Sequence, residues 1–314
     1  MRLRKYGITG KQVCEVGFGA WQLGNGRDWA ETTSEADAIT LVHKAIDEGC
    51  NFFDTAPGYG NGHSETILGK ALVGRRQQVV LNTKTGHLAN GSTDFAPAAI
   101  RMSVEESLVR LRTDYIDSVI LHNPPSECLS GDSPQMHELS LLYKEGKILA
   151  FGASVDSAAD MRTVLDTSAQ EGLVLEVLFN IFHQDTRRAF AIAAEKQAAI
   201  IVKVPLDSGW LSGKYGRDTS FSDIRSRWSP NIISRRFDLL EKVRFLESGD
   251  RTLAQAALQF VLAHPEVTTV IPGVKNEEQL RQNLSASAGR LSDEEVDALH
   301  ELWETELANN PLPW

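Results

Sequence analysis

Eight short apolar runs alternate with helical patterns along the chain, and this alternation is what most restricts the fold. Apolar residues at helical spacing separate the runs, as at Ile100, Val104, Leu108 and Leu111. The runs lie at residues 16–21, 51–54, 79–83, 118–122, 148–154, 175–180, 200–204 and 269–271. Strict alternation calls for a parallel sheet. Eight such units favour a closed barrel over an open doubly wound sheet, so we predict an α/β fold, a (β/α)8 TIM barrel.

Two segments lie outside the repeated unit. Two β-like runs around the turn Gly7–Gly10 predict an N-terminal β-hairpin before the first barrel strand. After the seventh strand, residues 205–250 form a long loop rich in Trp, Arg and Ser, as a lid would be. No Pro/Ser-rich linker or shift in composition divides the sequence, so residues 1–314 are interpreted as a single domain.

The charge balance and cysteine content exclude several classes of function. With 32 basic and 42 acidic residues the net charge is −10, which argues against nucleic-acid binding and against anionic membrane surfaces. No run of apolar residues is long enough to span a membrane, and no signal peptide is indicated. Cys14, Cys50 and Cys128 are few and far apart, so a disulfide framework is not expected and a cytoplasmic location is.

Four polar residues follow predicted strands at the point where each strand ends. Asp54 ends the second strand, Tyr59 lies on the loop after it, Lys84 ends the third strand and His122 ends the fourth. In a barrel these ends share one rim, where active sites are built. An ammonium group lowers the pKa of a neighbouring phenol, and a carboxylate is the natural counterion of a buried ammonium. The four side chains therefore predict proton transfer to or from a substrate oxygen, with His122 orienting that oxygen.

Each of these residues also has an ordinary structural interpretation when it is taken alone, as a helix cap, a turn residue or a side chain with satisfied hydrogen bonds.

The sequence motifs of other nucleotide-binding sites and of metal sites are incomplete. The run Gly17–Gln22 lacks the third glycine of the dinucleotide fingerprint, and Gly209–Tyr215 is one residue short of a phosphate loop. His137-Glu138 and His300-Glu301 lack the second histidine of a zinc-protease helix, so no metal site is predicted.

The sequence resembles the aldo-keto reductase family over about residues 17–283. The family's Asp, Tyr, Lys and His tetrad is similar to the four residues above, and several surrounding strings match in the same order. These strings are Phe53-Asp54-Thr55-Ala56, Gly62-His63-Ser64-Glu65, Asp114-Tyr115-Ile116-Asp117 and Gly152-Ala153-Ser154. The resemblance implies a (β/α)8 barrel that binds a nicotinamide cofactor across its mouth.

Family likeness also implies which residues hold the cofactor. They are Ser154, Glu176, Lys203, Pro205, Leu206, Ser208, Leu211, Gly213, Gly273, Lys275, Gln279 and Asn283. Ser154 and Glu176 would meet the nicotinamide carboxamide, and the helix after Ile271–Asn276 would hold the adenosine end. Lys275 favours NADP over NAD, which stays possible.

Four positions depart from the usual family pattern. Val155 replaces an asparagine, Glu176 a glutamine and Gln279 an arginine. Lys203 stands where a stacking aromatic residue is usual. Lys203 would lie over the nicotinamide ring or bind a phosphate, or alternatively it only caps the seventh strand.

The predicted activity is reduction of an aldehyde or ketone to an alcohol, or the reverse, with Tyr59 as the proton donor. Trp21, Tyr59 and His122 are expected to line the substrate pocket, with core packing as the alternative for Trp21. Arg225, Arg227 and the C-terminal tail are further candidates near the mouth. Two other functions stay open: a redox-sensing subunit that binds cofactor with little turnover, and a barrel isomerase or lyase that uses no nicotinamide. Neither the substrate nor the oligomeric state follows from the sequence.

Overall fold

Eight parallel strands form the centre of the structure, a computed structural model in which residues 1–25, 33–169 and 173–313 are described. Each strand is short and rich in buried β-branched or aromatic residues, as a sheet covered on both faces requires. The strands are β3 (Phe18–Gly19), β4 (Phe52–Asp54), β5 (Val80–Thr85), β6 (Ser118–His122), β7 (Phe151–Val155), β8 (Val174–Leu178), β9 (Ala199–Lys203) and β10 (Val267–Val270).

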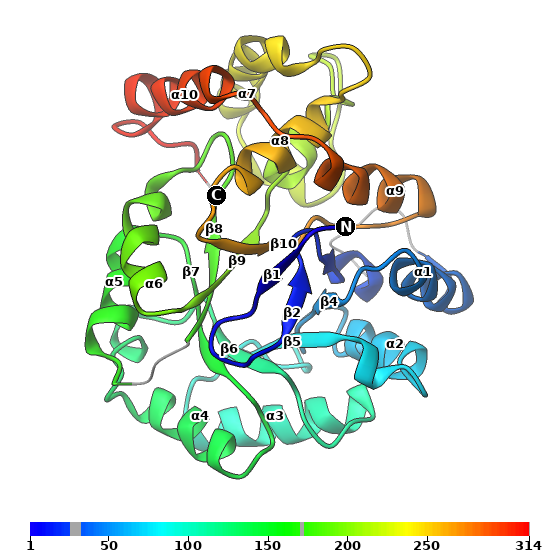
Figure 1. The fold of residues 1–314 in the computed structure, drawn as a ribbon, viewed down its shortest axis with the longest axis vertical. Helices are drawn as coiled ribbons and strands as arrows, with labels where there is room; N and C mark the ends of the chain where they lie inside the picture. The colour runs from blue at the N-terminus through cyan, green and yellow to red at the C-terminus, as the bar shows by residue number, and fades with distance from the viewer. Residues whose placement is uncertain (26–32, 170–172, 314) are drawn as a thin grey trace.

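The sheet closes on itself. Its strands are hydrogen-bonded in sequence order from β3 to β10, and parallel bridges join Val16 to Val270 and Gly19 to Gly273 across the remaining gap. Figure 1 looks along the resulting cylinder, with helices arranged around it. All eight predicted strands are present, and the barrel prediction is confirmed.

The helices between the strands begin at residues that favour helix starts. Ser34 caps α1, and Thr252 with Gln255 forms a capping box on α8. The helices are α1 (Glu35–Asp47), α2 (His63–Ala71), α3 (Pro97–Leu111), α4 (Pro134–Lys144), α5 (Ala158–Thr167), α6 (Phe190–Glu195), α7 (Pro230–Val243), α8 (Leu253–Leu262), α9 (Glu277–Ser285) and α10 (Asp293–Leu302). Helices such as α3, α4, α5, α6 and α8 pack their apolar faces on the outside of the barrel, as the helical spacing of their apolar residues predicts, whereas α7 packs on the turn Asp207–Ser212.

The predicted hairpin is formed by the antiparallel strands β1 (Leu3–Lys5) and β2 (Gln12–Cys14). It lies across the end of the barrel where the strands begin (Figure 1). The buried Tyr6 follows β1, and its hydroxyl is 2.5 Å from the Ser118 hydroxyl at the start of β6. The hairpin therefore covers the end opposite to the one where Asp54 and His122 lie.

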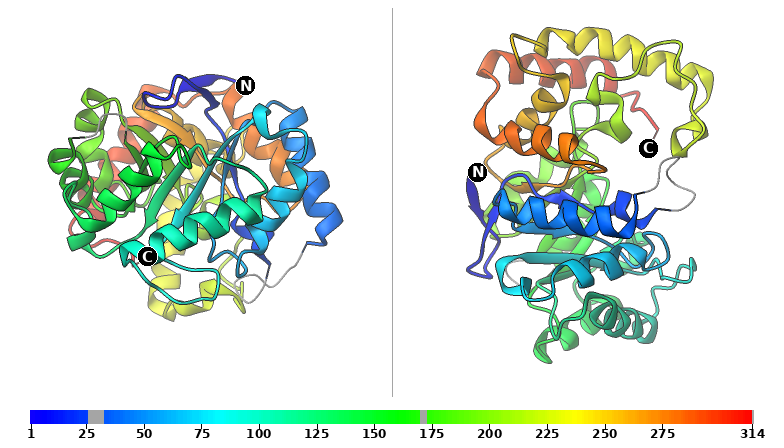
Figure 2. Two further views of the ribbon diagram at one scale, coloured as in Figure 1. Left: turned by 90° about the horizontal axis from the view of Figure 1, so that it is seen from below. Right: turned by 90° about the vertical axis from the view of Figure 1, so that its right-hand side faces the viewer.

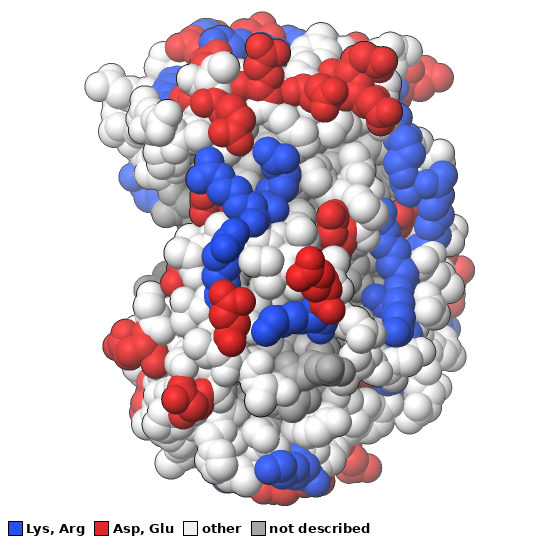
Figure 3. Space-filling view, turned by 60° about the vertical axis from the view of Figure 1, so that its left-hand side comes forward, with Lys and Arg blue, Asp and Glu red and all other residues white. Residues whose placement is uncertain are grey.

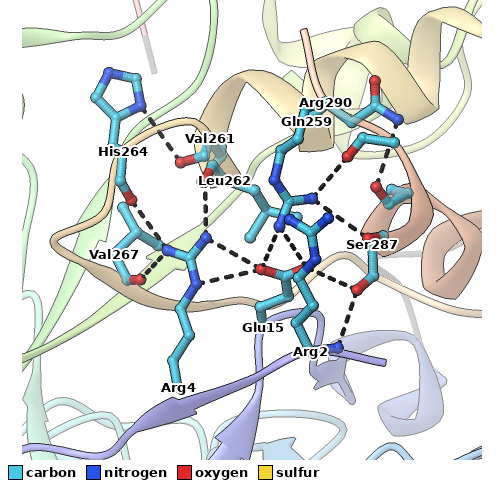
Figure 4. Close-up of polar contacts among 12 residues, drawn as sticks. Arg2, Arg4, Glu15, Gln259, Val261, Leu262, His264, Val267, Ser287 and Arg290 are labelled. Atoms are coloured by element: carbon cyan, nitrogen blue, oxygen red, sulfur yellow. Dashed lines mark hydrogen bonds and ion pairs between the residues drawn. The ribbon is translucent and has the colours of Figure 1, made fainter.

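A buried carboxylate fastens this covered end. Glu15 accepts hydrogen bonds from Arg4, Arg290 and the Ser287 hydroxyl, the last at 2.7 Å. Arg4 also donates to the carbonyl oxygens of Leu262 and His264, as Figure 4 shows. One carboxylate thus ties the hairpin to the end of α8 and to the segment before α10.

The long segment after β9 is more ordered than the loop that the sequence predicts. It contains the 3-10 turn Asp207–Ser212 and the fourteen-residue helix α7. The buried Trp210 packs against Phe237 of α7 and against Trp228, with ring centroids 5.2 and 6.0 Å away. In the left view of Figure 2 this yellow-green segment and the blue hairpin lie at opposite ends of the molecule.

The surface matches the acidic composition. On the face in Figure 3, acidic side chains line the upper edge, and basic groups lower down are interrupted by acidic and uncharged surface. None of the helices within the described residues is long and apolar enough to cross a membrane.

Candidate active site

The strand ends bring three of the four predicted catalytic residues to one rim. Asp54 is the last residue of β4, Lys84 is next to last in β5, and His122 is the last residue of β6. Tyr59 lies in the turn that follows β4. The Lys84 ammonium is 2.6 Å from Asp54 Oδ1 and 5.2 Å from the centre of the Tyr59 ring. The Tyr59 and His122 rings meet edge to face with centroids 6.0 Å apart.

Lys84 is buried and surrounded by acceptors. Its ammonium contacts both oxygens of Asp54, the carbonyl oxygen of Thr55 at 3.1 Å and Glu176 Oε2 at 3.1 Å. Burial alone would lower the pKa of Lys84, but the charges of Asp54 and Glu176 raise it above its ordinary value. Lys84 is therefore a permanent cation. The Glu176 contact crosses the barrel interior, because β5 and β8 are not neighbours in the sheet.

Tyr59 is held in a tight turn. Its ring stacks on Trp21 at 5.9 Å between centroids and 25° between planes. Gly60 has a φ of +61°, and a Cβ at Gly60 would lie 1.8 Å from the carbonyl oxygen of Gly24. Only glycine fits this contact, so the position of the preceding tyrosine depends on it.

The pKa of Tyr59 differs from the sequence-based prediction. Burial raises this pKa above its ordinary value, Asp54 and Glu176 raise it further, and Lys84 opposes them without reversing the shift. The ammonium has the predicted effect, but the prediction of a lowered pKa is wrong for this structure. Tyr59 accordingly holds its proton at neutral pH.

His122 is a neutral imidazole. Burial lowers its pKa well below the usual range, and the charges of Lys84 and Lys203 lower it further. Its Nδ1 is buried and has no hydrogen-bond partner among the described residues. Its ring also meets that of His87 at 4.9 Å between centroids. A neutral ring beside Tyr59 suits a hydrogen bond to a substrate oxygen.

A cleft of about 810 Å³ opens over these residues and continues toward α9. Most of the predicted cofactor and substrate residues line it. They are Trp21, Asp54, Tyr59, His122, Glu176, Lys203, Pro205, Leu206, Ser208, Gly273, Lys275, Gln279 and Asn283. Four predicted residues do not line it: Lys84, Ser154 and Leu211 are buried, and Gly213 is exposed.

The sequence left the role of Lys203 open, and the structure shows what its ammonium contacts. Its ammonium is 2.8 Å from the Ser154 hydroxyl, 2.6 Å from Asn123 Oδ1 and 2.8 Å from Asp156 Oδ1. Three acceptors match the three donors of an ammonium. Lys203 therefore places a fixed positive charge beside Ser154, at the end of the cleft nearest His122.

The loop after β9 has the backbone of an anion cradle. Ser208 and Gly209 have positive φ, and so does Gly213 where the turn ends. Arg225, which also lines the cleft, donates from Nε to the Ser208 carbonyl oxygen at 2.7 Å. The carboxylate of Asp207, next to Ser208, is buried against Arg236 of α7. Successive amides in such turns form anion-binding concavities.

The other end of the cleft is the start of α9. Asn276 caps this helix, and the Gln279 side chain accepts a hydrogen bond from the Lys275 amide at 2.9 Å. Asn283 donates to the Gly273 carbonyl oxygen at 3.3 Å. Lys275 and the helix start thus face the cleft, although Gln279 is already engaged within the loop.

Sequence reasoning missed Gln22, His87 and Asn123, which also line the cleft. Asn123 directly follows His122, and His87 lies in the loop after β5, three residues after Lys84, so proximity to a predicted residue was the available signal. The Leu312 side chain is buried, and the Pro313 carbonyl oxygen is bound by Arg236 of α7. The tail was predicted to lie near the mouth of the barrel. In the described residues it contacts α7 through Pro313, and Trp314 lies outside the described residues.

Comparisons with known proteins agree with the geometry. The model of the Aldo/keto reductase family matches residues 15–304. The oxidoreductase YqkF of Bacillus subtilis is 30% identical over 308 residues, 95% of this chain and 95% of that protein. The NADH-specific methylglyoxal reductase of Escherichia coli is 29% identical over 324 residues, 95% of this chain and 97% of that protein. The solved holo form of an aldo-keto reductase from Bacillus halodurans has a TM-score of 0.80 at 29% identity and covers 96% of both chains. The chain therefore belongs to the aldo/keto reductase family.

Proposed function

We propose that this protein is an NAD(P)H-dependent oxidoreductase that reduces an aldehyde or ketone to an alcohol, or runs the reverse reaction. The observation that carries the proposal is the contact of Lys84 with Asp54 beneath the Tyr59 ring, with His122 at the edge of that ring. A phenol with an ammonium below it and a neutral imidazole beside it is suited to move a proton at a carbonyl oxygen.

The cleft fits a nicotinamide nucleotide along its length. The positive-φ turn at Ser208–Gly209 offers backbone amides to a pyrophosphate, and the start of α9 offers a helix N-terminus to the adenosine end. Gln22 Oε1 is buried without a hydrogen-bond partner among the described residues, and Gln22 lines the cleft beside Gly273. Buried polar atoms normally have a hydrogen-bond partner. The unpartnered Gln22 Oε1 therefore supports the proposal that a polar group of a nucleotide binds here.

The residues of the tetrad take separate roles. A bound nicotinamide supplies or accepts the hydride. Tyr59 gives its proton to the substrate oxygen, and Lys84 stabilises the phenolate that this leaves. Asp54 keeps Lys84 charged and fixed in place. His122, neutral and beside Tyr59, donates a hydrogen bond that orients the substrate oxygen. Trp21 and His87 form the walls near the reacting atom.

The proposed nucleotide is NADP, because Lys275 faces the cleft at the start of α9. Two features weaken this preference. Gln279 stands where family likeness expects an arginine and is bound to the Lys275 amide. Glu277 and Glu278 place carboxylates in the first turn of the same helix. A single surface lysine contributes modestly, so we expect activity with both nucleotides and a moderate preference for NADP.

The proposal is tested by following the absorbance of NADPH and NADH with a panel of aldehydes and ketones. Consumption of either nucleotide that depends on the carbonyl compound supports the enzyme. Cofactor binding without turnover across the panel would instead support a redox-sensing subunit. Failure to bind either nucleotide, measured by fluorescence quenching, would contradict both and leave a barrel isomerase or lyase as the alternative.

A further inference from the structure

Two buried carboxylates share one ammonium at the base of the cleft. Asp54, Lys84 and Glu176 are each no more than 2% exposed. Lys84 is 2.6 and 2.8 Å from the two oxygens of Asp54 but 3.1 Å from Glu176. With all three groups ionised, the cluster would hold an uncompensated negative charge away from water, which is strongly unfavourable. One carboxyl group must therefore carry a proton.

Glu176 is the group that holds this proton. Asp54 has the two shorter contacts with Lys84 and a further hydrogen bond from the Asn82 amide at 2.7 Å. Glu176 Oε2, in contrast, makes only the longer contact with Lys84, and the Glu176 side chain otherwise meets the Asp54 carboxylate, to which it can hydrogen-bond only when it is protonated. A protonated carboxyl group is the form that tolerates such a site.

The charged and titratable groups around Glu176 come from several elements. Asp54 and Lys84 face it from β4 and β5, Lys203 from β9, Tyr59 from the rim, and Tyr6 from the hairpin side. Burial and the charge of Asp54 raise the pKa of Glu176 to about 8, and Lys84 and Lys203 oppose this increase. The pKa values of Tyr59 and Lys84 lie above their ordinary values and that of His122 lies well below its own. Glu176 is thus the group of this cluster that titrates near neutral pH.

Glu176 also lies where the charge of a cofactor changes with its redox state. It lines the cleft with Tyr59, His122 and Lys203, and the strand register places it beside Ser154. An oxidised nicotinamide ring carries one positive charge and a reduced ring carries none. The Lys203 ammonium is paired with the Asp156 carboxylate at 2.8 Å, so it disfavours a second cation nearby only in part.

We propose that Glu176 releases its proton to solvent when the oxidised cofactor binds and keeps it when the reduced cofactor binds. This inference rests on the proposed function, since it requires a nicotinamide in the cleft. The balance is simple: one positive charge enters the site with the oxidised ring and one leaves as a proton, whereas the reduced ring brings no charge and displaces none. Glu176 is then a positioning residue whose ionisation follows the redox state of the cofactor.

The consequence is a pH dependence that differs between the two cofactor forms. A cation about 4–6 Å away lowers a carboxyl pKa by about 1 to 3. The Kd of the oxidised form is then expected to fall about tenfold for each pH step of one, between the lowered pKa in the complex and about 8 in the free protein. The Kd of the reduced form stays level over the same range. The 2′-phosphate of NADP is common to both forms, so its own titration cancels in the ratio of the two Kd values.

The experiment measures the Kd of NADP and of NADPH by quenching of tryptophan fluorescence between about pH 6 and pH 9, a range that brackets the Glu176 pKa. Proton release on mixing is measured in weak buffer with a pH indicator. For the wild type we expect the ratio of the oxidised to the reduced Kd to fall at least about tenfold over this range. Up to one proton is expected to be released per oxidised cofactor bound, with the largest release between the lowered pKa in the complex and about 8. In Glu176→Gln, we expect a ratio independent of pH and no proton release.

Two further variants separate this coupling from a merely structural role. Lys203→Met removes the fixed cation, so we expect tighter binding of the oxidised form at every pH while the pH dependence of the ratio persists. Glu65→Gln removes another wholly buried carboxylate, which contacts Thr83 and Arg110, and is expected to retain the wild-type pH dependence. Binding of both forms with a ratio that does not change with pH would overturn the proton coupling alone. Absence of binding of both forms at every pH would contradict the proposed function and this inference together.

Discussion

Lys84 and Asp54 form a buried ion pair in which one ammonium contacts both carboxylate oxygens, at 2.6 and 2.8 Å. Because Glu176 approaches the same ammonium from across the barrel, the positive charge of Lys84 lies between two carboxyl groups. The pair therefore links the stability of the barrel interior to the proposed proton transfer at Tyr59.

Removing the phenol hydroxyl is expected to abolish most of the turnover. In Tyr59→Phe the ring still stacks on Trp21, but no proton can be given to the substrate oxygen, so kcat is expected to fall by at least about 100-fold. Cofactor binding is expected to persist, which fluorescence quenching checks. Tyr115→Phe, at a half-buried tyrosine outside the cleft whose hydroxyl donates to Gln77, is the matched control. Near-normal turnover in Tyr59→Phe would remove Tyr59 from the role of proton donor.

Lys84→Met is expected to destabilise the fold as well as impair the reaction. The variant leaves Asp54 and Glu176 facing each other without a cation, and breaking a buried pair in this way costs about 3–5 kcal/mol. Urea unfolding followed by circular dichroism measures the loss. Lys147→Met, which removes a surface pair with Glu105, is expected to cost at most about 1 kcal/mol. Equal stability of the two variants would contradict the account of the cluster.

Lys275→Met tests the choice of nucleotide. If Lys275 contacts the 2′-phosphate, the Kd of NADPH is expected to rise by about fivefold, while that of NADH hardly changes, since an exposed ion pair contributes up to about 1 kcal/mol. Lys44→Met is the control, because Lys44 of α1 pairs with Glu277 in the first turn of α9, next to the loop that carries Lys275. An equal effect of Lys275→Met on both nucleotides would mean that Lys275 does not read the 2′-phosphate.

Glu15→Gln is expected to loosen the covered end of the barrel without touching the cleft. Burial alone would raise the Glu15 pKa, but hydrogen bonds from Ser287 and Arg290 and the charges of Arg290 and Arg4 lower it below the ordinary value. Glu15 therefore stabilises the folded state fully above its unfolded pKa, about 4.3, and loses this contribution as the pH falls through its lower folded pKa.

At neutral pH the variant leaves two arginines without their carboxylate, and we expect a loss of about 3–5 kcal/mol in the free energy of unfolding. In acid the wild type and the variant are expected to converge, because Glu15 is then protonated. Urea unfolding at neutral and acidic pH compares them, with the exposed Glu48→Gln as the control. A difference between wild type and variant that stays constant with pH would rule out ionised Glu15 as its source.

Gly60→Ala is expected to lower turnover through the backbone. A Cβ at Gly60 would meet the Gly24 carbonyl oxygen at 1.8 Å, so the turn that presents Tyr59 must move. Gly74 has a similar positive φ, and a Cβ at this position would have nothing within 4 Å, so Gly74→Ala carries the same backbone strain of about 1 kcal/mol and no clash. Steady-state kinetics are expected to show a lower kcat for Gly60→Ala alone. An unchanged kcat in both variants would show that the turn tolerates the displacement.

Much of this architecture is predictable from local sequence. The alternating apolar runs predict all eight strands. Because parallel strands share one direction, their ends also predict that Asp54 and His122 lie on one rim. The segment after β9 was predicted as a loop, yet Ile233, Phe237 and Leu240 bury one face of α7 there. Its charged residues obscured the helical period.

Contacts across the barrel could not be predicted in the same way. The approach of Glu176 to Lys84 depends on the inclination of strands that are not neighbours, and no local pattern encodes it. The position of Lys203 likewise depends on acceptors from two other loops and from β7, which only the assembled rim brings together. The same limit explains the error on the Tyr59 pKa, since the degree of burial is a property of the whole site.

The parallel bridge between Val16 and Val270 has a consequence for biosynthesis. During translation the β3 edge stays unpaired until nearly the whole barrel has emerged from the ribosome, and an exposed edge is prone to pair with other chains. Contacts so far apart in sequence are slow to form. Closure of the barrel therefore requires its first and final strands, which are far apart in sequence, to come together.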